Sequence, residues 1–338
     1  MKRGRLVGGM GLGLLMLAAA GFAGEDASPT EIRQAVNRAM PVMLQSIAEY
    51  PRHNTCFSCH HQGAPMFALA LAKSHGYPVA EKPLQAIVQT TTADLHADLA
   101  LYTGGKGQPG GVTRAGYAML ALEAAGAKHD ENTAAVSGFL VQKDRELGYW
   151  RAASNRPPAE VSSFTNTFLS IRALKAFGDE AQKAAVAERI AKAKTWLEQT
   201  PTKETEDRVF QLWGLKVAGA EPAVLQKLTR ELAAEQKEDG GWAQLPGSNS
   251  DSYATSTVLT ALILGGSLAP NDSVVQRGVR YLLKTQQPDG TWHVVTRSKA
   301  VQPYFESGFP YGRDQFISMA ATAWSTAALV LAGPTSGR

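Results

Sequence analysis

A seven-residue segment that occurs twice, fifty residues apart, constrains the fold of this chain more than any other feature. Gln236-Lys-Glu-Asp-Gly-Gly-Trp242 corresponds to Gln286-Gln-Pro-Asp-Gly-Thr-Trp292, and a looser copy runs from Gln142 to Trp150. Repetition at a fixed period is typical of stacked supersecondary units. Each copy follows a helix-like apolar stretch and, after a polar loop, precedes a second one. The sequence therefore predicts helical hairpins with the repeated segment at their corners.

The same template extends over most of the chain and predicts six hairpins. The second helices mix small residues with leucine and end at or near Gly178, Gly265 and Gly333, and glycine commonly follows the last residue of a helix. The predicted helix pairs are 31–49 with 64–75, 83–101 with 112–125, 136–141 with 165–177, 182–199 with 206–218, 225–233 with 255–264, and 279–283 with 320–331.

Strand-like alternation is scarce, so we expect an all-α protein. Apolar helices built from small residues can pack on every side, which suits the inner layer of a ring. The predicted fold is an α/α toroid of about six helical hairpins, with inner helices surrounded by outer ones. In this scheme residues 24–80 form the first hairpin, residues 81–333 form the rest of the toroid, and residues 334–338 form a flexible tail.

Residues 1–23 have the pattern of an export signal: basic residues, then an apolar run over 6–20, then a small-residue end at Ala23. We expect cleavage there and a periplasmic or otherwise exported protein. A retained membrane anchor is the alternative, although the run is short for a span. No later segment is expected to be long and apolar enough to cross a membrane. Without the leader, 31 Lys and Arg stand against 30 Asp and Glu, which gives no support to nucleic-acid binding.

The fullest copy of the repeat, Arg277–Trp292, resembles the QW repeat of squalene-hopene and oxidosqualene cyclases, and Gly308-Phe309-Pro310 is similar to another motif of these enzymes. The resemblance, to a superfamily that carries the prenyltransferase and squalene oxidase repeat, covers residues 80–333. It implies a six-hairpin toroid and an apolar, isoprenoid-like ligand. It also implies a structural repeat, in which Gln caps a helix end and contacts the Trp indole.

The catalytic acid of these cyclases lies in an Asp-x-Asp-Asp motif, which alignment places at Asp251-Ser-Tyr-Ala254. Protonating an alkene needs a carboxylic acid kept protonated by a neighbour, and only the first acid is present. We therefore expect no cyclisation of squalene. Asp251 is a helix N-cap or a weak catalytic candidate, so a terpenoid cyclase or lyase stays an alternative function.

The zinc ligands of the related prenyltransferases cannot be assembled at the matching positions, because both cysteines lie in the first hairpin. The remaining candidate, His293, is expected at a hairpin corner.

The sharpest chemical motif is Cys56-Phe57-Ser58-Cys59-His60. Its spacing is that of covalent haem c attachment, in which two thiols bond to the porphyrin and the following histidine ligates the iron. We predict haem c held by Cys56, Cys59 and His60 in an exported redox protein that has a redox partner protein. A local disulfide, a zinc site and a thioredoxin-like redox pair are the alternatives for the cysteines. A non-catalytic binding or scaffold module is a further alternative for the whole protein.

The motif is expected where the first outer helix meets the first inner helix, so that the haem would lie at the mouth of the toroid. The sixth iron ligand is expected to be Met66, His53, His75 or His96, or no residue at all. The long loop over 293–314 is expected either to pack against neighbouring corners or to line a cavity on the ring axis. We expect such a cavity because small residues on the inner helices leave room there. The aromatic and charged residues of the loop are Tyr304, Phe305, Phe309, Tyr311, Arg313 and Asp314.

Overall fold

The computed structural model describes Met1, residues 26–300 and residues 303–334, so the predicted signal peptide lies outside the described residues apart from Met1. The described part contains thirteen α-helices and no strand, which confirms the all-α prediction. The helices are α1 (Pro29–Glu49), α2 (Ala64–Ser74), α3 (Glu81–Ala97), α4 (Leu99–Thr103), α5 (Gly111–Ala124), α6 (Glu131–Gln142), α7 (Ser163–Phe177), α8 (Lys183–Gln199), α9 (Thr205–Ala218), α10 (Pro222–Ala234), α11 (Ser252–Leu264), α12 (Ser273–Thr285) and α13 (Gln315–Ala332).

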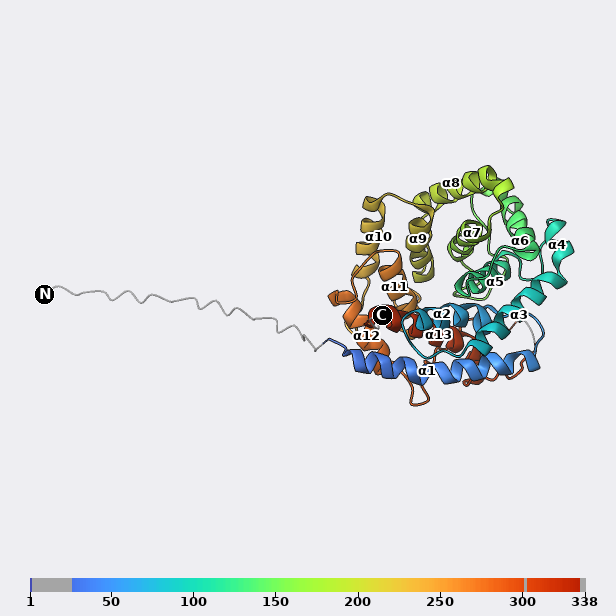
Figure 1. Ribbon diagram of the computed structural model, residues 1–338. Coiled ribbons are helices and arrows are strands. Elements are labelled where there is room, and N and C mark those ends of the chain that lie inside the picture. Colours follow the sequence, from blue (N-terminus) through green and yellow to red (C-terminus); the bar gives the residue numbers. More distant parts are fainter. Residues whose placement is uncertain (2–25, 301–302, 335–338) are drawn as a thin grey trace.

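The helices form a closed ring of two layers (Figure 1). The inner layer consists of α2, α5, α7, α9, α11 and α13; each packs against the next, and α13 packs against α2 to close the ring. The outer layer consists of α1, α3, α4, α6, α8, α10 and α12. The predicted α/α toroid is therefore confirmed. One predicted outer helix, 83–101, is divided at Asp98 into α3 and α4.

Helix starts in the ring follow from short sequence signals. The Ser28 side chain accepts a hydrogen bond from the Glu31 amide, and the Glu31 carboxylate accepts one from the Ser28 amide, so the two residues form a capping box at α1. Asp251 begins α11 by accepting a 3.0 Å hydrogen bond from the Ala254 amide. Such caps satisfy N–H groups that the first helical turn leaves without a partner.

The last inner helix corrects the expectation that no segment after the leader is suited to crossing a membrane. Within the described residues, Gly312–Ala332 is long and apolar enough for a span. In the ring, 89% of its apolar window is buried inside the protein. A helix enclosed on all sides needs an apolar surface on every face, as a membrane span does, so the ring itself accounts for this composition.

The three tryptophans of the repeat make the same pair of hydrogen bonds. Each indole N–H donates over 2.8–2.9 Å to the carbonyl ten residues earlier, on the preceding outer helix: Trp150 to Leu140, Trp242 to Leu232, and Trp292 to Leu282. Each backbone N–H donates to a threonine hydroxyl on the following inner helix, at Thr167, Thr255 and Thr322 respectively. Because each tryptophan ties one outer helix to its inner partner, the predicted hairpin corners are confirmed.

The glutamines of the repeat make hydrogen bonds that extend beyond their own hairpins. The amide of Gln286 donates to its own corner at the Gly290 carbonyl and, over 2.8 Å, to the Ala35 carbonyl of α1. Gln236 likewise reaches the next outer helix at the Val274 carbonyl. These side chains therefore link neighbouring hairpins, and the Gln286 bond joins the last hairpin to the first.

In the looser copy of the repeat, Gln142 does not occupy the position of the repeat glutamine. Asp144, and not Gln142, lies six residues before Trp150, at the position that Gln236 and Gln286 occupy in the other copies. Its carboxylate accepts hydrogen bonds from the Arg151 amide at 3.0 Å and from the Arg151 guanidinium. In this copy, the Asp144 carboxylate therefore binds Arg151 of its own corner, where the glutamine amides of the other copies link neighbouring hairpins.

Replacing Gly290 by alanine is expected to destabilise the ring by about 2–4 kcal/mol, because the residue has φ +91° and its Cβ would lie 2.3 Å from the Arg38 carbonyl of α1. Gly126→Ala is the matched control, since Gly126 has φ +70° with no heavy atom within 4 Å of the added carbon. The control should cost only about 1 kcal/mol. Urea unfolding of the two variants measures the difference, and equal losses would contradict a tight contact between the last corner and α1.

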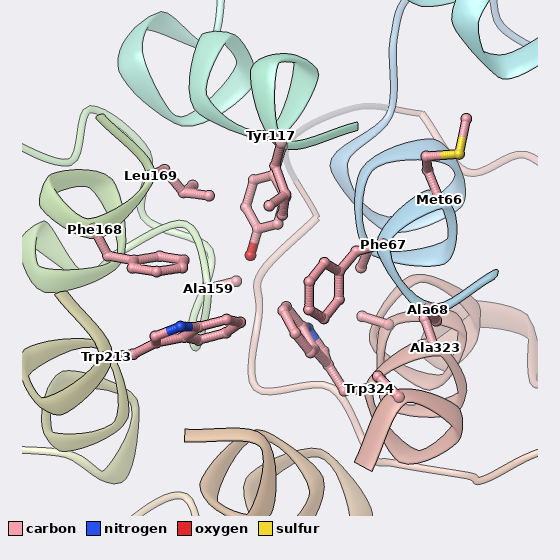
Figure 2. Close-up of a cluster of buried hydrophobic side chains, with 14 of the residues drawn as sticks. Met66, Phe67, Ala68, Tyr117, Ala159, Phe168, Leu169, Trp213, Ala323 and Trp324 are labelled. Atoms are coloured by element: carbon pink, nitrogen blue, oxygen red, sulfur yellow. The ribbon is translucent and has the colours of Figure 1, made fainter. Parts of the chain in front are cut away.

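The axis of the ring is filled, contrary to the expectation of an axial cavity. Aromatic side chains from the inner helices converge there (Figure 2), with Phe67, Phe168, Trp213 and Trp324 all at most 6% exposed. The ring centroids of Phe168 and Trp213 lie 4.5 Å apart, and those of Phe67 and Trp324 lie 5.4 Å apart. Small residues on the inner helices let these large rings meet, so the space is occupied by the protein itself.

Candidate functional site

A cavity of about 400 Å³ lies at the end of the ring where the inner helices begin, and both cysteines and His60 line it. Its walls come from the α1–α2 connection, the start of α5, the loop before α7, and the loop and first turn of α13. This is also the end of the ring that carries the tryptophan corners. The volume falls within the range of small-molecule sites. The predicted position of the motif, at the mouth of the toroid, agrees with this geometry.

The cysteine motif is held by a capped turn and by a carboxylate from α3. Ser58 accepts a hydrogen bond from the His61 amide at the start of a π-helical turn, Cys59–Gly63, which leads directly into α2. The Phe57 amide donates over 3.0 Å to Asp94. Asp94 also accepts hydrogen bonds from Gln108 and from the guanidinium of Arg114. One buried carboxylate therefore joins the motif, α3 and the start of α5.

The two cysteines are free thiols that are partly exposed. Burial raises the pKa of the Cys59 thiol well above its ordinary value, and the nearby carboxylate of Glu160 acts in the same direction. A thiol with a raised pKa stays protonated at neutral pH and is therefore a weak nucleophile.

His60 faces a buried carboxylate through one ring nitrogen. Its Nδ1 lies 3.7 Å from Oε1 of Glu160, whose side chain is 5% exposed. Desolvation lowers the pKa of His60 although Glu160 opposes that effect, so the ring is neutral near pH 7. The next residue, His61, points elsewhere: it is fully buried, stacks on Tyr50 and lies 2.8 Å from the Ser307 hydroxyl. Of the two adjacent histidines, only His60 lines the cavity.

The cavity wall is rich in positive charge. Four of the lining side chains are basic and only Glu160 is acidic. Two of the four are held in place by carboxylates, Arg114 by Asp94 and Arg156 by Glu160. The basic lining residues are Arg114, Arg156, Lys299 and Arg313. An anionic or carboxylate-bearing ligand suits this wall.

None of the four residues proposed as sixth iron ligands is among the residues that line the cavity. Met66 is fully buried and its side chain points away from the aromatic centre in Figure 2. His53 lies 3.3 Å from a Glu49 oxygen, His75 contacts the Leu71 carbonyl at 2.9 Å, and His96 contacts Asn132 at 3.2 Å. Among the described lining residues, His60 is the one histidine and there is no methionine.

The long loop before α13 divides between the two roles expected for it. Tyr304, Phe305 and Arg313 line the cavity. Phe309 is 2% exposed in the core, and Tyr311 stacks on His293 with ring centroids 4.4 Å apart. His293 also pairs with Asp314 over 2.8 Å at its corner.

Within the parts of the chain that are described, no three His, Cys, Asp or Glu side chains form a metal-binding group, so the zinc alternative for the cysteines has no ligand set there.

A buried acid that sequence reasoning missed lies beside the position of the lost cyclase motif. Glu206 of α9 is 4% exposed and accepts hydrogen bonds from the Thr165 hydroxyl at 2.8 Å and the Tyr253 hydroxyl at 3.2 Å. Burial raises the pKa of Glu206 to about 8, so its carboxyl is protonated at neutral pH. Tyr253 occupies the position of the middle acid in the aligned motif, which means that a neighbouring helix supplies a carboxylic acid where the motif lacks one. Burial also raises the pKa of Asp251, which serves as the cap of α11.

Known proteins share this architecture. Residues 174–337, slightly less than half of the chain, match the family described as squalene-hopene cyclase C-terminal domain. A variant of the type II terpene cyclase MstE from Scytonema, solved with its product merosterolic acid A, is 14% identical with a TM-score of 0.53, over 91% of this chain and 98% of that chain. A crystal structure of a protein from Actinoplanes is 14% identical with a TM-score of 0.54, over 89% of this chain and 99% of that one.

The same architecture also occurs with other chemistry. A variant of an unsaturated glucuronyl hydrolase from Streptococcus agalactiae matches with a TM-score of 0.53 at 12% identity, over 91% of this chain and 92% of that one. At such identities the similarity concerns the fold and leaves the activity undetermined. Together with the closed ring and the tryptophan corners, the matches show that the chain has the α/α toroid fold and that residues 174–337 are similar to the C-terminal domain of squalene-hopene cyclases.

Proposed function

We propose that the protein is an exported redox protein that carries one covalently attached haem c in the cavity at the mouth of its toroid. Cys56 and Cys59 would form the thioethers and His60 would be the proximal iron ligand. The observation that carries the proposal is that all three side chains line one cavity of about 400 Å³. The export pattern over 1–23 supports it, since this haem type is attached outside the bacterial cytoplasm.

The other residues of the cavity fit the chemistry of haem. Phe305, Phe316 and Ile317 offer apolar and aromatic surface to a porphyrin face, and the guanidinium groups of Arg114 and Arg156 suit its two propionates. The neutral ring of His60 has a lone pair available for iron. Bound haem would supply one-electron transfer or ligand chemistry, and the protein would set its potential and the access of solvent.

Absorption spectroscopy and mass spectrometry test the proposal on mature protein produced in an exporting host that has haem-maturation proteins. We expect a pyridine haemochrome spectrum of the c type and a mass increased by one haem. The haem should stay with the polypeptide on a denaturing gel. A colourless protein of unmodified mass from that host would refute the proposal.

Acid-catalysed isoprenoid chemistry is a second candidate, favoured by the protonated carboxyl of Glu206 beside Tyr253. It agrees with the fold, because MstE, which shares this architecture, is a type II terpene cyclase that has been solved with its product. The filled axis speaks against it, since Glu206 is 4% exposed and does not line the described cavity. An isoprenoid chain would have to displace the aromatic cluster to reach this acid.

Incubation with squalene tests the second candidate. We expect no cyclised product from the parent protein, from Asp251→Asn or from Glu206→Gln. Turnover by the parent that is lost in Glu206→Gln but kept in Asp251→Asn would establish Glu206 as a proton donor. Such turnover by haem-free protein would also count against the redox proposal, because it would be an activity that needs no haem.

A further inference from the structure

Glu160 makes an unequal set of contacts through its two carboxylate oxygens. Oε2 accepts a hydrogen bond from the Ser154 hydroxyl at 3.2 Å and pairs with the Arg156 guanidinium. Oε1 faces Nδ1 of His60 at 3.7 Å. The carboxylate is almost completely buried, with 5% of its side chain exposed, and the His60 side chain is 18% exposed. One oxygen is thus held by its own loop, and the other is directed at a residue one hundred positions earlier in the chain.

Such a contact determines which nitrogen of a histidine can bind a metal. Histidines that ligate metals commonly donate their second ring N–H to a carboxylate or a carbonyl, which fixes the tautomer and the orientation of the ring. When Nδ1–H is directed at Glu160, Nε2 carries the lone pair. The contact also makes the imidazole a stronger electron donor, because the carboxylate draws the Nδ1 proton toward itself.

Resting on the proposed function, we infer that Glu160 is a positioning residue for the proximal ligand of the haem. Its Oε1, 3.7 Å from Nδ1, favours the tautomer that carries the proton on Nδ1, which would leave Nε2 free for the iron. Its negative charge would lower the reduction potential by favouring the ferric state. Arg156 opposes this effect, because its guanidinium holds Oε2 and shares the negative charge. The pair of residues would therefore set the potential from the loop before α7.

The test uses the holoprotein and two variants that each remove one carboxylate. Glu160→Gln is expected to raise the midpoint potential and to change the hyperfine shifts of the His60 ring protons in the cyanide-bound ferric protein. Asp94→Asn is the matched control, because Asp94 is buried near the same cavity and pairs with Arg114 but contacts the Phe57 amide and not His60. It should raise the potential less and leave the hyperfine shifts of His60 unchanged.

Arg156→Gln supplies a result of opposite sign. Releasing Oε2 strengthens the carboxylate, so the midpoint potential should fall and the hyperfine shifts of the His60 ring protons should change. The change in the His60 shifts separates this effect from the loss of a charge beside a propionate, and it holds as a test even if Glu160→Gln does not accumulate as holoprotein. The inference is overturned if the His60 shifts of Glu160→Gln match those of the parent, or if Arg156→Gln leaves the potential unchanged. Failure of the proposed function itself is seen separately, as absence of covalent haem from the parent protein.

Discussion

A Cys56→Ala, Cys59→Ala double variant is expected to contain no covalently bound haem, because both thioether-forming sulfurs that line the cavity are removed. Each single variant should keep one thioether and show a haemochrome band shifted from that of the parent. The measurement is haem staining on a denaturing gel, followed by the haemochrome spectrum. The effect is a complete loss and not a reduction, since the described cavity offers no third thiol.

Ser58→Ala is the control for disturbance of the loop. It removes the hydroxyl that caps the turn at Cys59–Gly63 but leaves both thiols and His60 in place. This variant should lose about 1 kcal/mol of stability and retain covalent haem. If the double cysteine variant still carried haem through a denaturing gel, the attachment would have to involve other residues, and the assignment of the motif would be wrong.

Glu206→Gln is expected to abolish a pH dependence of stability of several kcal/mol. The folded protein holds the Glu206 proton up to a pKa of about 8, whereas the ordinary value is 4.5, so the folded state binds more protons than the unfolded state between these pH values. The stabilisation is complete below pH 4.5 and is lost as the pH rises through 8. At about 1.4 kcal/mol per pH unit, the parent loses on the order of 5 kcal/mol relative to Glu206→Gln over this window.

Chemical denaturation at a series of pH values from 4.5 to 9 measures this difference. Other buried groups titrate equally in both proteins, so subtracting the two curves isolates Glu206. Glu238→Gln, at an exposed position, is the control and should follow the parent at every pH. A difference curve that stays flat would mean that the Glu206 carboxyl is ionised in the folded protein, which would also remove the observation that favours acid catalysis.

Local sequence signals were sufficient to predict the ring. The fifty-residue repeat, the glycines that follow the inner helices and the apolar periodicity are all short-range features, and they placed six hairpins in their observed order. The position of the cysteine motif also followed, because a residue at a hairpin corner lies at one end of a ring whichever residues face it. The register of the looser repeat was predicted wrongly, because the prediction followed the residue type of Gln142 and not the six-residue spacing to the tryptophan, which places Asp144 at that position.

Tertiary structure alone decided what surrounds the site and what fills the axis. Glu160 meets His60 and Glu206 meets Tyr253 across intervals of tens of residues, and no periodicity in the sequence links such partners. The inner helices were predicted to leave space because each is rich in small residues. Whether the few large residues from different helices meet on the axis depends on the rotation of every helix about its own axis, which packing in the closed ring determines. The sequence determined the hairpins and their corners, and the closed ring determined the neighbours of each buried side chain.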